Sequence, residues 1–227
     1  RYKEFGFKDA RERTYDMNDE LLIGVLALQG DVEENIKAAT DALAEMNQKG
    51  KVISVRYPEE IMKVDGLIIP GGESTVMGLL IALKNGLLDS INKVLKKELP
   101  IMGTCAGMIV LAKKSYDRVV GNKKQLLLGA LDIEIERNSF GRQFDSFESN
   151  LEISGIGNDF RGIFIRAPSV VSTGPQVQIL GKFDGKIVAV QQGNFIGTSF
   201  HPELSGDNRM HKLFIESIAK WKKANNH

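Results

Sequence analysis

Short, almost wholly apolar runs alternate with amphipathic stretches in the first half of the chain. The runs at 21–28, 51–56 and 64–72 are too short for typical helices, and each predicts a strand buried on both faces, which is typical of a parallel sheet. Residues 31–46 carry apolar side chains at helical spacing, and Asp31 stands where the N-cap of that helix is expected.

The same alternation continues to about residue 114. Residues 74–97 are helical in pattern, with Ser74 or Thr75 placed to cap the helix, and PIMG at 100–103 predicts a fourth strand before another apolar helix. Strands that alternate with helices predict a doubly wound α/β fold with right-handed crossovers.

The second half is richer in strands. Residues 130–137 alternate apolar and acidic side chains, which predicts a strand with one face in water. Further strands are expected at 162–168, 177–183, 186–192 and 194–203, and an amphipathic helix closes the chain. We therefore predict one domain, with a mixed, mainly parallel sheet flanked by helices. Its boundaries are 20–227, and residues 1–19 are expected to be an N-terminal extension.

Composition and charge narrow the class of protein. Thirty basic and 29 acidic residues leave a net charge of +1, which gives no electrostatic footprint for nucleic acid or an acidic membrane. No apolar run approaches the roughly 20 residues that span a bilayer. A single cysteine cannot form an internal disulfide and fits a reducing compartment, so we expect a cytoplasmic protein. No metal and no cofactor are expected.

That cysteine, Cys105, lies in GTCAG at 103–107, between a predicted strand and a predicted helix. Flanking glycines permit a sharp turn, and a helix N-terminus favours thiolate, as in a nucleophile elbow. The N–H of Ala106 would face an oxyanion formed at this thiol. A free cysteine that merely fills the core is the alternative reading.

The sequence offers few histidines that could serve as the base for such a nucleophile, so the assignment is nearly forced. Of three histidines, His227 ends the chain and His211 lies in the closing helix, where a surface position is expected. His201 ends a predicted strand in SFHPEL, and an extended backbone would project Glu203 to the same side as an orienting carboxylate. The glycines of PGGEST at 70–75 permit N–H groups to converge on an anion, although this motif alone also fits an ordinary turn.

Together, GVLALQGD, PGGEST, GTCAGM, ERNSFGRQFDSFE, FIRAP and SFHPEL resemble the class I, triad-type glutamine amidotransferases. The resemblance runs from about residue 21 to the C-terminus. PGGEST, RNSFGRQ and FIRAP narrow it to the glutaminase subunits of pyridoxal 5′-phosphate synthase.

The resemblance implies a role for each matching residue. Cys105 would attack the amide of L-glutamine, His201 would relay protons and Glu203 would orient it. Gly72 and Ala106 would form the oxyanion hole, and Gln29 would respond to a partner. The glutamine site is implied to contain Gly72, Glu73, Ser74, Arg137, Ile165 and Arg166. An arginine fork suits the α-carboxylate of glutamine, although each arginine also fits a solvated strand end.

The resemblance also implies a (β/α)₈-barrel synthase subunit as the protein partner, which receives the ammonia, and a glutaminase active mainly in that complex. Three alternatives stay open. They are another class I glutaminase, a cysteine hydrolase with a similar elbow, and a non-catalytic glutamine-binding or scaffolding subunit.

Overall fold

The apolar runs of the first half lie side by side as parallel strands in a computed structural model, which describes residues 20–117, 121, 125–141 and 145–225. The helices are α1 Val32–Glu45, α2 Pro58–Ile61, α3 Ser74–Leu83, α4 Leu87–Lys96, α5 Ala106–Leu111 and α6 Arg209–Asn225, with a 3-10 helix, η2, at Pro202–Leu204. The strands are β1 Leu21–Leu26, β2 Gly50–Val55, β3 Gly66–Ile69, β4 Ile101–Thr104, β5 Ala112–Asp117, β6 Leu131–Arg137, β7 Ser146–Ile153, β8 Gly157–Ile165, β9 Ser169–Thr173, β10 Gln178–Phe183, β11 Lys186–Gln192 and β12 Phe195–Thr198.

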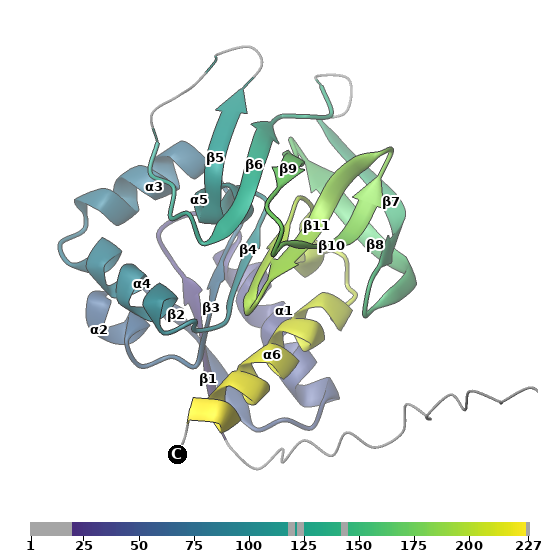
Figure 1. Cartoon of the computed structure of the whole chain (residues 1–227). Helices are drawn as coiled ribbons and strands as arrows, with labels where there is room; N and C mark the ends of the chain where they lie inside the picture. Colours follow the sequence, from purple (N-terminus) through teal and green to yellow (C-terminus); the bar gives the residue numbers. More distant parts are fainter. Residues whose placement is uncertain (1–19, 118–120, 122–124, 142–144, 226–227) are drawn as a thin grey trace, which may run out of the picture.

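Within the described residues these strands form one mixed sheet (Figure 1). The order β2-β1-β3-β4-β12 is parallel throughout, and β11, β10, β7 and β8 continue it antiparallel. Strands β5, β6 and β9 branch from this path, with β9 pairing β11. The single-domain α/β prediction with helices on both faces is confirmed.

Two apolar clusters explain why the central strands are buried on both faces. On one face, Leu21, Ile23 and Val25 of β1 pack with residues of α1 and α6. On the other, Leu67 and Ile69 of β3 pack with α3, α4 and α5. Because successive side chains of a strand point to opposite faces, a continuous apolar run supplies both clusters.

The helical pattern over 74–97 is not one helix, so that expectation is wrong in detail. The chain breaks between Leu83 and Leu87, where Gly86 has φ 76 and precedes α4. A left-handed residue ends regular helix geometry, and glycine takes it at little cost. The apolar helix after β4 is only Ala106–Leu111, because residues 112–117 continue as strand β5. Sequence patterning also missed α2, β7 and β9.

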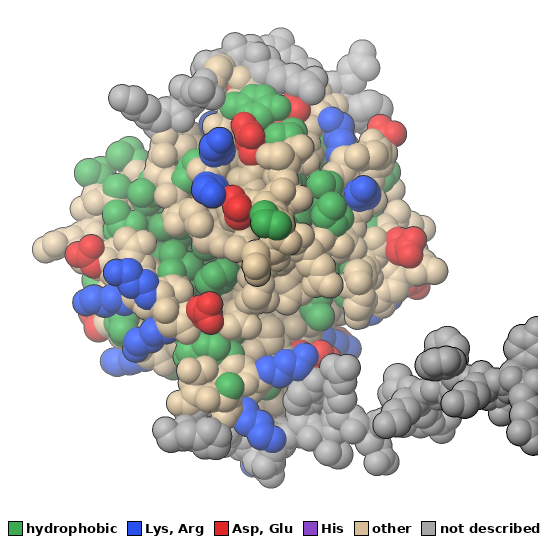
Figure 2. All heavy atoms as spheres, in the orientation of Figure 1, with side chains coloured by type: hydrophobic (Ala, Val, Ile, Leu, Met, Phe, Trp, Pro, Cys, Tyr) green, Lys and Arg blue, Asp and Glu red, His purple; other side chains and the backbone are tan. Residues whose placement is uncertain are grey.

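Charged side chains of both signs are interspersed on the face shown in Figure 2, and hydrophobic side chains gather there on the side where Figure 1 places α3. Val76, Leu79 and Leu83 of α3 are 44%, 55% and 72% exposed. Among the described residues, no single helix is long and apolar enough to cross a membrane. Helices α3 and α4, bent by 101° at their junction, meet that test only as a pair. Residues 1–19 lie outside the described part, so the boundary at residue 20 stays a prediction.

The parallel strands position the candidate site. In-register pairing places Thr198 beside Thr104 and Ile69 beside Gly103, so β12, β4 and β3 end at one edge of the sheet. The segments that follow these ends carry His201, Cys105 and the glycines of PGGEST. Sites in open α/β sheets form at this carboxyl edge.

Candidate active site

Cys105 occupies a sharp turn between β4 and α5. Its backbone has φ 49 and ψ −104, a region that non-glycine residues rarely adopt, and its N–H donates to Thr198 O at 2.7 Å. The flanking glycines are needed for close packing, since a Cβ on Gly107 would lie 2.0 Å from Ile69 O and one on Gly103 would lie 2.6 Å from the Gly107 carbonyl carbon. Cys105 carries a free thiol and is 7% exposed as a residue, at the N-terminus of a helix.

His201 follows β12 and faces this turn. Its backbone N–H donates to Ile163 O at 2.8 Å, its Nδ1 lies 2.9 Å from Glu203 Oε1, and the Cys105 thiol is close enough to raise the pKa of its imidazole. The expected geometry of this pair is corrected in one respect. Glu203 lies in the 3-10 helix that begins at Pro202, not in an extended strand, and that turn still directs the carboxylate to the imidazole.

Burial and hydrogen bonding set the electrostatics of the pair. Burial of His201, 4% exposed, lowers the pKa of the imidazole, but the contacts with Asp31, the Cys105 thiol and Glu203 outweigh burial and raise that pKa above its ordinary value. Burial raises the pKa of Glu203, and its contact with His201 opposes this rise. The Glu203 side chain has no exposed surface, and its Oε2 has no hydrogen-bond partner.

The glycine loop after β3 approaches both His201 and Gln29. A Cβ on Gly71 would lie 2.4 Å from His201 Cε1, so only glycine fits against the ring. Gly72 has φ +149, and its α-carbon faces the Gln29 amide. That amide pairs twice with the backbone of Glu73: Gln29 Nε2 donates to Glu73 O at 3.0 Å, and Glu73 N donates to Gln29 Oε1 at 3.3 Å.

Glu73 joins the loop to Arg137. Its carboxylate accepts from the N–H groups of Thr75 and Val76, so Glu73 is the N-cap of α3 in place of the expected Ser74 or Thr75. It also accepts from Arg137 Nη2 at 3.1 Å. Burial raises the pKa of Glu73, but these backbone bonds, a Thr75 side-chain bond and the arginine lower it on balance. Arg137 ends β6, and its side chain is 15% exposed.

The remaining residues predicted for the site range from buried to exposed. Ala106 is the first residue of α5, directly after the thiol. Ile165 O lies 3.8 Å from Cys105 Sγ, which donates to it. Ser74 is buried and donates to Gln125 Oε1 at 3.3 Å. Arg166 has φ 43, donates its backbone N–H to Asp145 O, and has an exposed side chain.

Comparison with known proteins places this arrangement in a family. A model of the SNO glutamine amidotransferase family matches residues 25–220. The chain belongs to this family. The matched residues include the turn at Cys105, the glycine loop and the segment that carries His201.

Individual relatives agree with the family match. A protein of Nitrosopumilus maritimus named pyridoxal 5′-phosphate synthase subunit PdxT is 49% identical over 88% of this chain and 98% of its own. One of the same name from Bacillus licheniformis is 45% identical over 89% and 97%. A crystal structure titled glutamine amidotransferase matches with TM-score 0.75 and 42% identity, covering 86% of this chain and 98% of that one.

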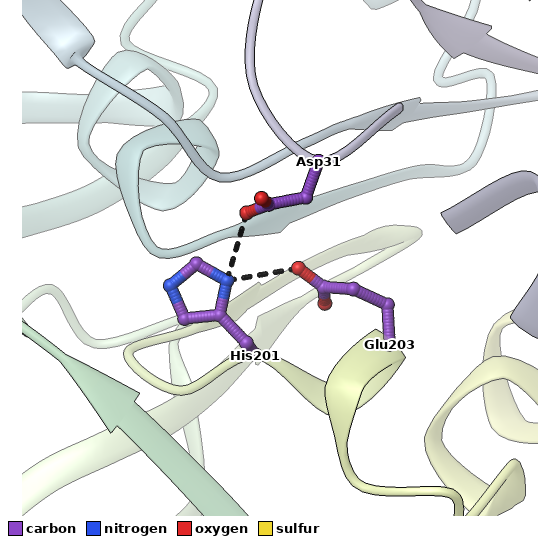
Figure 3. A group of neighbouring side chains, drawn as sticks. All are labelled: Asp31, His201 and Glu203. Carbon is purple, nitrogen blue, oxygen red and sulfur yellow. Dashed lines mark hydrogen bonds and ion pairs between the residues drawn. The ribbon is translucent and has the colours of Figure 1, made fainter. Parts of the chain in front are cut away.

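Sequence reasoning missed two residues at this family member's site. Asp31 Oδ2 lies 3.1 Å from His201 Nδ1, and Asp31 makes no side-chain cap on α1, although it holds the expected N-cap position (Figure 3). Gln125 accepts from Ser74 and Thr75, and its amide donates to Ser115. Asp31 stands just after a buried parallel strand, and this placement at the sheet edge was the available signal.

Asp31, His201 and Glu203 also have ligand atoms within 4.8 Å of one another, a spacing that a metal ion needs. Both carboxylates contact the same atom, His201 Nδ1, and a single N–H proton on that nitrogen can be shared between them. We therefore interpret the group as a hydrogen-bonded base.

Proposed function

We propose that this chain is a glutaminase, which hydrolyses L-glutamine to L-glutamate and ammonia through a γ-glutamyl thioester on Cys105. The observation that carries the proposal is the grouping of a thiol, an imidazole and a carboxylate on one edge of the sheet, where Cys105 raises the pKa of His201 and Glu203 Oε1 lies 2.9 Å from His201 Nδ1. Family membership and relatives named as synthase subunits support it. The same grouping speaks against a non-catalytic scaffold.

The chemistry follows from this grouping. His201 takes the thiol proton, and Cys105 Sγ forms a bond to the amide carbon of glutamine. The tetrahedral intermediate collapses as His201 returns the proton to the leaving nitrogen, which departs as ammonia. Water, deprotonated by His201, then attacks the thioester carbon, and the broken C–S bond releases glutamate and the thiol. Glu203 holds the imidazole and stabilises its charged form.

The oxyanion of that intermediate needs N–H donors near Cys105. Ala106 begins α5, where helix N–H groups lack intrahelical acceptors, and Gly72 is the second proposed donor. The Gln29 amide closes over Gly72 and bonds both backbone groups of Glu73. A change in Gln29 therefore reaches the loop that holds the second donor, and this supports its role as the partner-responsive residue.

Glutamine recognition rests on Glu73 and Arg137. A guanidinium has five N–H donors in a fixed fork. Arg137 donates from Nη2 to the Glu73 carboxylate and from Nη1 to the Thr75 hydroxyl. The remaining donors suit the α-carboxylate of glutamine, with the Glu73 carboxylate near the α-ammonium. Ser74, the Gly72 backbone, Ile165 and Arg166 complete the proposed site.

The ammonia has to reach an acceptor before water protonates it. We assign as partner a (β/α)₈-barrel synthase subunit of pyridoxal 5′-phosphate synthesis, in the cytoplasm, without nucleic acid or membrane. The exposed apolar side chains of α3 support a protein partner, because such patches mark interaction surfaces. They begin beside Glu73 and Ser74, so a partner there lies next to the site. The glutaminase is expected to be active mainly in the complex.

The test is glutamate and ammonia release from L-glutamine by the full chain, with and without the synthase subunit. Release is expected to be strong only with the subunit, and Cys105→Ala is expected to reduce it to background while the two subunits still associate. His201→Asn is expected to do the same. Arg161→Ala is the control, because it breaks an exposed ion pair with Glu148 and replaces no residue of the proposed site.

Two results would overturn the proposal. Glutamine hydrolysis that persists in Cys105→Ala would remove the nucleophile. A wild-type chain that binds the subunit yet releases no glutamate would favour the non-catalytic alternative.

A further inference from the structure

Two carboxylates, not one, meet the same nitrogen of His201. Glu203 Oε1 lies 2.9 Å and Asp31 Oδ2 lies 3.1 Å from Nδ1 (Figure 3). They come from opposite ends of the chain, Glu203 from η2 and Asp31 from the turn between β1 and α1. Both distances are within the range of an N–H···O bond, so the single Nδ1 proton can be shared between them.

The approach of Asp31 is built into the backbone. A Cβ on Gly71 would lie 2.7 Å from Asp31 Oδ2, and a Cβ on Gly30 would lie 1.7 Å from Gly71 O. The Asp31 N–H donates to Gly71 O at 3.3 Å, and the buried Asn35 side chain donates to Asp31 O at 2.8 Å. These contacts hold the Asp31 backbone on two sides, so that its carboxylate points toward the imidazole.

We propose that Asp31 is a positioning residue for His201, which fixes Nδ1 jointly with Glu203 and so keeps the second ring nitrogen toward Cys105. The catalytic consequence rests on the proposed glutaminase function, but the contact itself does not. Asp31 acts through the histidine and is not assigned a contact with substrate.

The two carboxylates have different surroundings. The Glu203 side chain is fully buried and has one oxygen without a partner, whereas the Asp31 side chain is 33% exposed. Burial opposes the charged form of a carboxyl group, and water favours it. Asp31 therefore adds negative charge beside the imidazole at lower cost in desolvation. The ionisable groups that face His201 are Asp31, Glu203 and the Cys105 thiol.

The test is a titration of His201 by NMR in the full chain with labelled histidine, in a Cys105→Ala background so that the thiol does not titrate with it. His201→Asn assigns the signal. Asp31→Asn keeps the size and shape of the side chain but removes its charge. An opposite charge at this distance shifts a pKa by about one unit or more, so the titration midpoint of His201 is expected to fall by about one pH unit. Asp31→Glu is expected to recover part of this shift.

Glu33→Gln is the matched control, because Glu33 is an exposed acid in the first turn of the same helix. It removes the same charge and is expected to leave the His201 midpoint in place. With Cys105 intact and the synthase subunit present, Asp31→Asn is expected to move the acid limb of kcat/KM to lower pH by the same amount. It should also lower kcat about tenfold with KM for glutamine unchanged.

The outcomes separate the two proposals. An unmoved His201 midpoint in Asp31→Asn, or an equal shift in Glu33→Gln, would overturn the role of Asp31 while glutaminase activity stands. A shifted midpoint in a chain without glutaminase activity would support the contact and overturn the proposed function.

Discussion

Gly71→Ala places one methyl group against His201 and Asp31 and replaces none of the proposed catalytic residues. The added Cβ would lie 2.4 Å from His201 Cε1, 2.9 Å from His201 Nδ1 and 2.7 Å from Asp31 Oδ2. Gly71 does not have a left-handed φ, so the alanine backbone itself is tolerated. The perturbation is therefore steric and local.

The size of the effect follows from these distances. Carbon atoms pack at about 3.5 Å or more, so the ring and the loop have to separate by about 1 Å. The loop cannot easily yield, because Gly71 O is already packed against Gly30 and bonded to Asp31 N. If the ring moves by about 1 Å, its 2.9 Å bond to Glu203 leaves the usual range of roughly 2.7–3.2 Å. A misplacement of about 1 Å costs on the order of 100-fold in rate, and overpacking costs about 1–3 kcal/mol in unfolding free energy.

The assay is glutamate release in the presence of the synthase subunit, with urea unfolding of the same preparations. Gly24→Ala is the control, because the three atoms nearest to its added Cβ belong to the side chains of Val55 and Val64, at 3.0 to 3.2 Å, within the core. We expect Gly71→Ala to lose about 100-fold in kcat and Gly24→Ala to retain activity at a comparable loss of stability. A folded Gly71→Ala protein with wild-type kcat would refute the reasoning.

Two further predictions concern binding and acid stability. Arg137→Ala is expected to raise KM for glutamine about tenfold or more, with a smaller change in kcat. Arg161→Ala is the control, because it breaks an exposed ion pair with Glu148, and it is expected to leave KM and kcat unchanged. An unaltered KM of Arg137→Ala in steady-state kinetics would remove Arg137 from the site. Burial lowers the pKa of His211 to about 4, so its unfolded form, near 6.5, takes up a proton first as pH falls. Unfolding free energies from urea titrations should therefore fall by roughly 2–3 kcal/mol more in wild type than in His211→Gln between pH 7.5 and 4.5.

The features that the sequence predicts are those encoded by local spacing. Apolar runs of strand length mark the parallel strands, and each run supplies both faces of the sheet. Glycines two residues on either side of Cys105 predict its turn, since both are needed for backbone contact there. His201 follows by elimination among three histidines, but the surface position predicted for His211 is wrong, because that residue is fully buried.

The missed features depend on contacts between distant segments. The break at Gly86 lies within apolar spacing that continues on both sides, so periodicity does not reveal it. Glu203 reaches His201 through a 3-10 turn, which the two-residue spacing of a strand does not describe. Asp31 has the sequence position of a helix cap, and only the packing of its turn on Gly71 turns the carboxylate to the imidazole.

The turn after β1 contacts three parts of the site through three consecutive residues. Gln29 bonds the backbone of Glu73, Gly30 packs on the Gly71 carbonyl, and Asp31 reaches His201. A displacement of this turn is therefore expected to disturb the glycine loop and the base together, because the turn contacts both in a closely packed interior. Under the proposed function, a partner that engages this turn acts on oxyanion stabilisation and on proton transfer in a single step. A Gln29 substitution would then impair the first of these, and an Asp31 substitution the second.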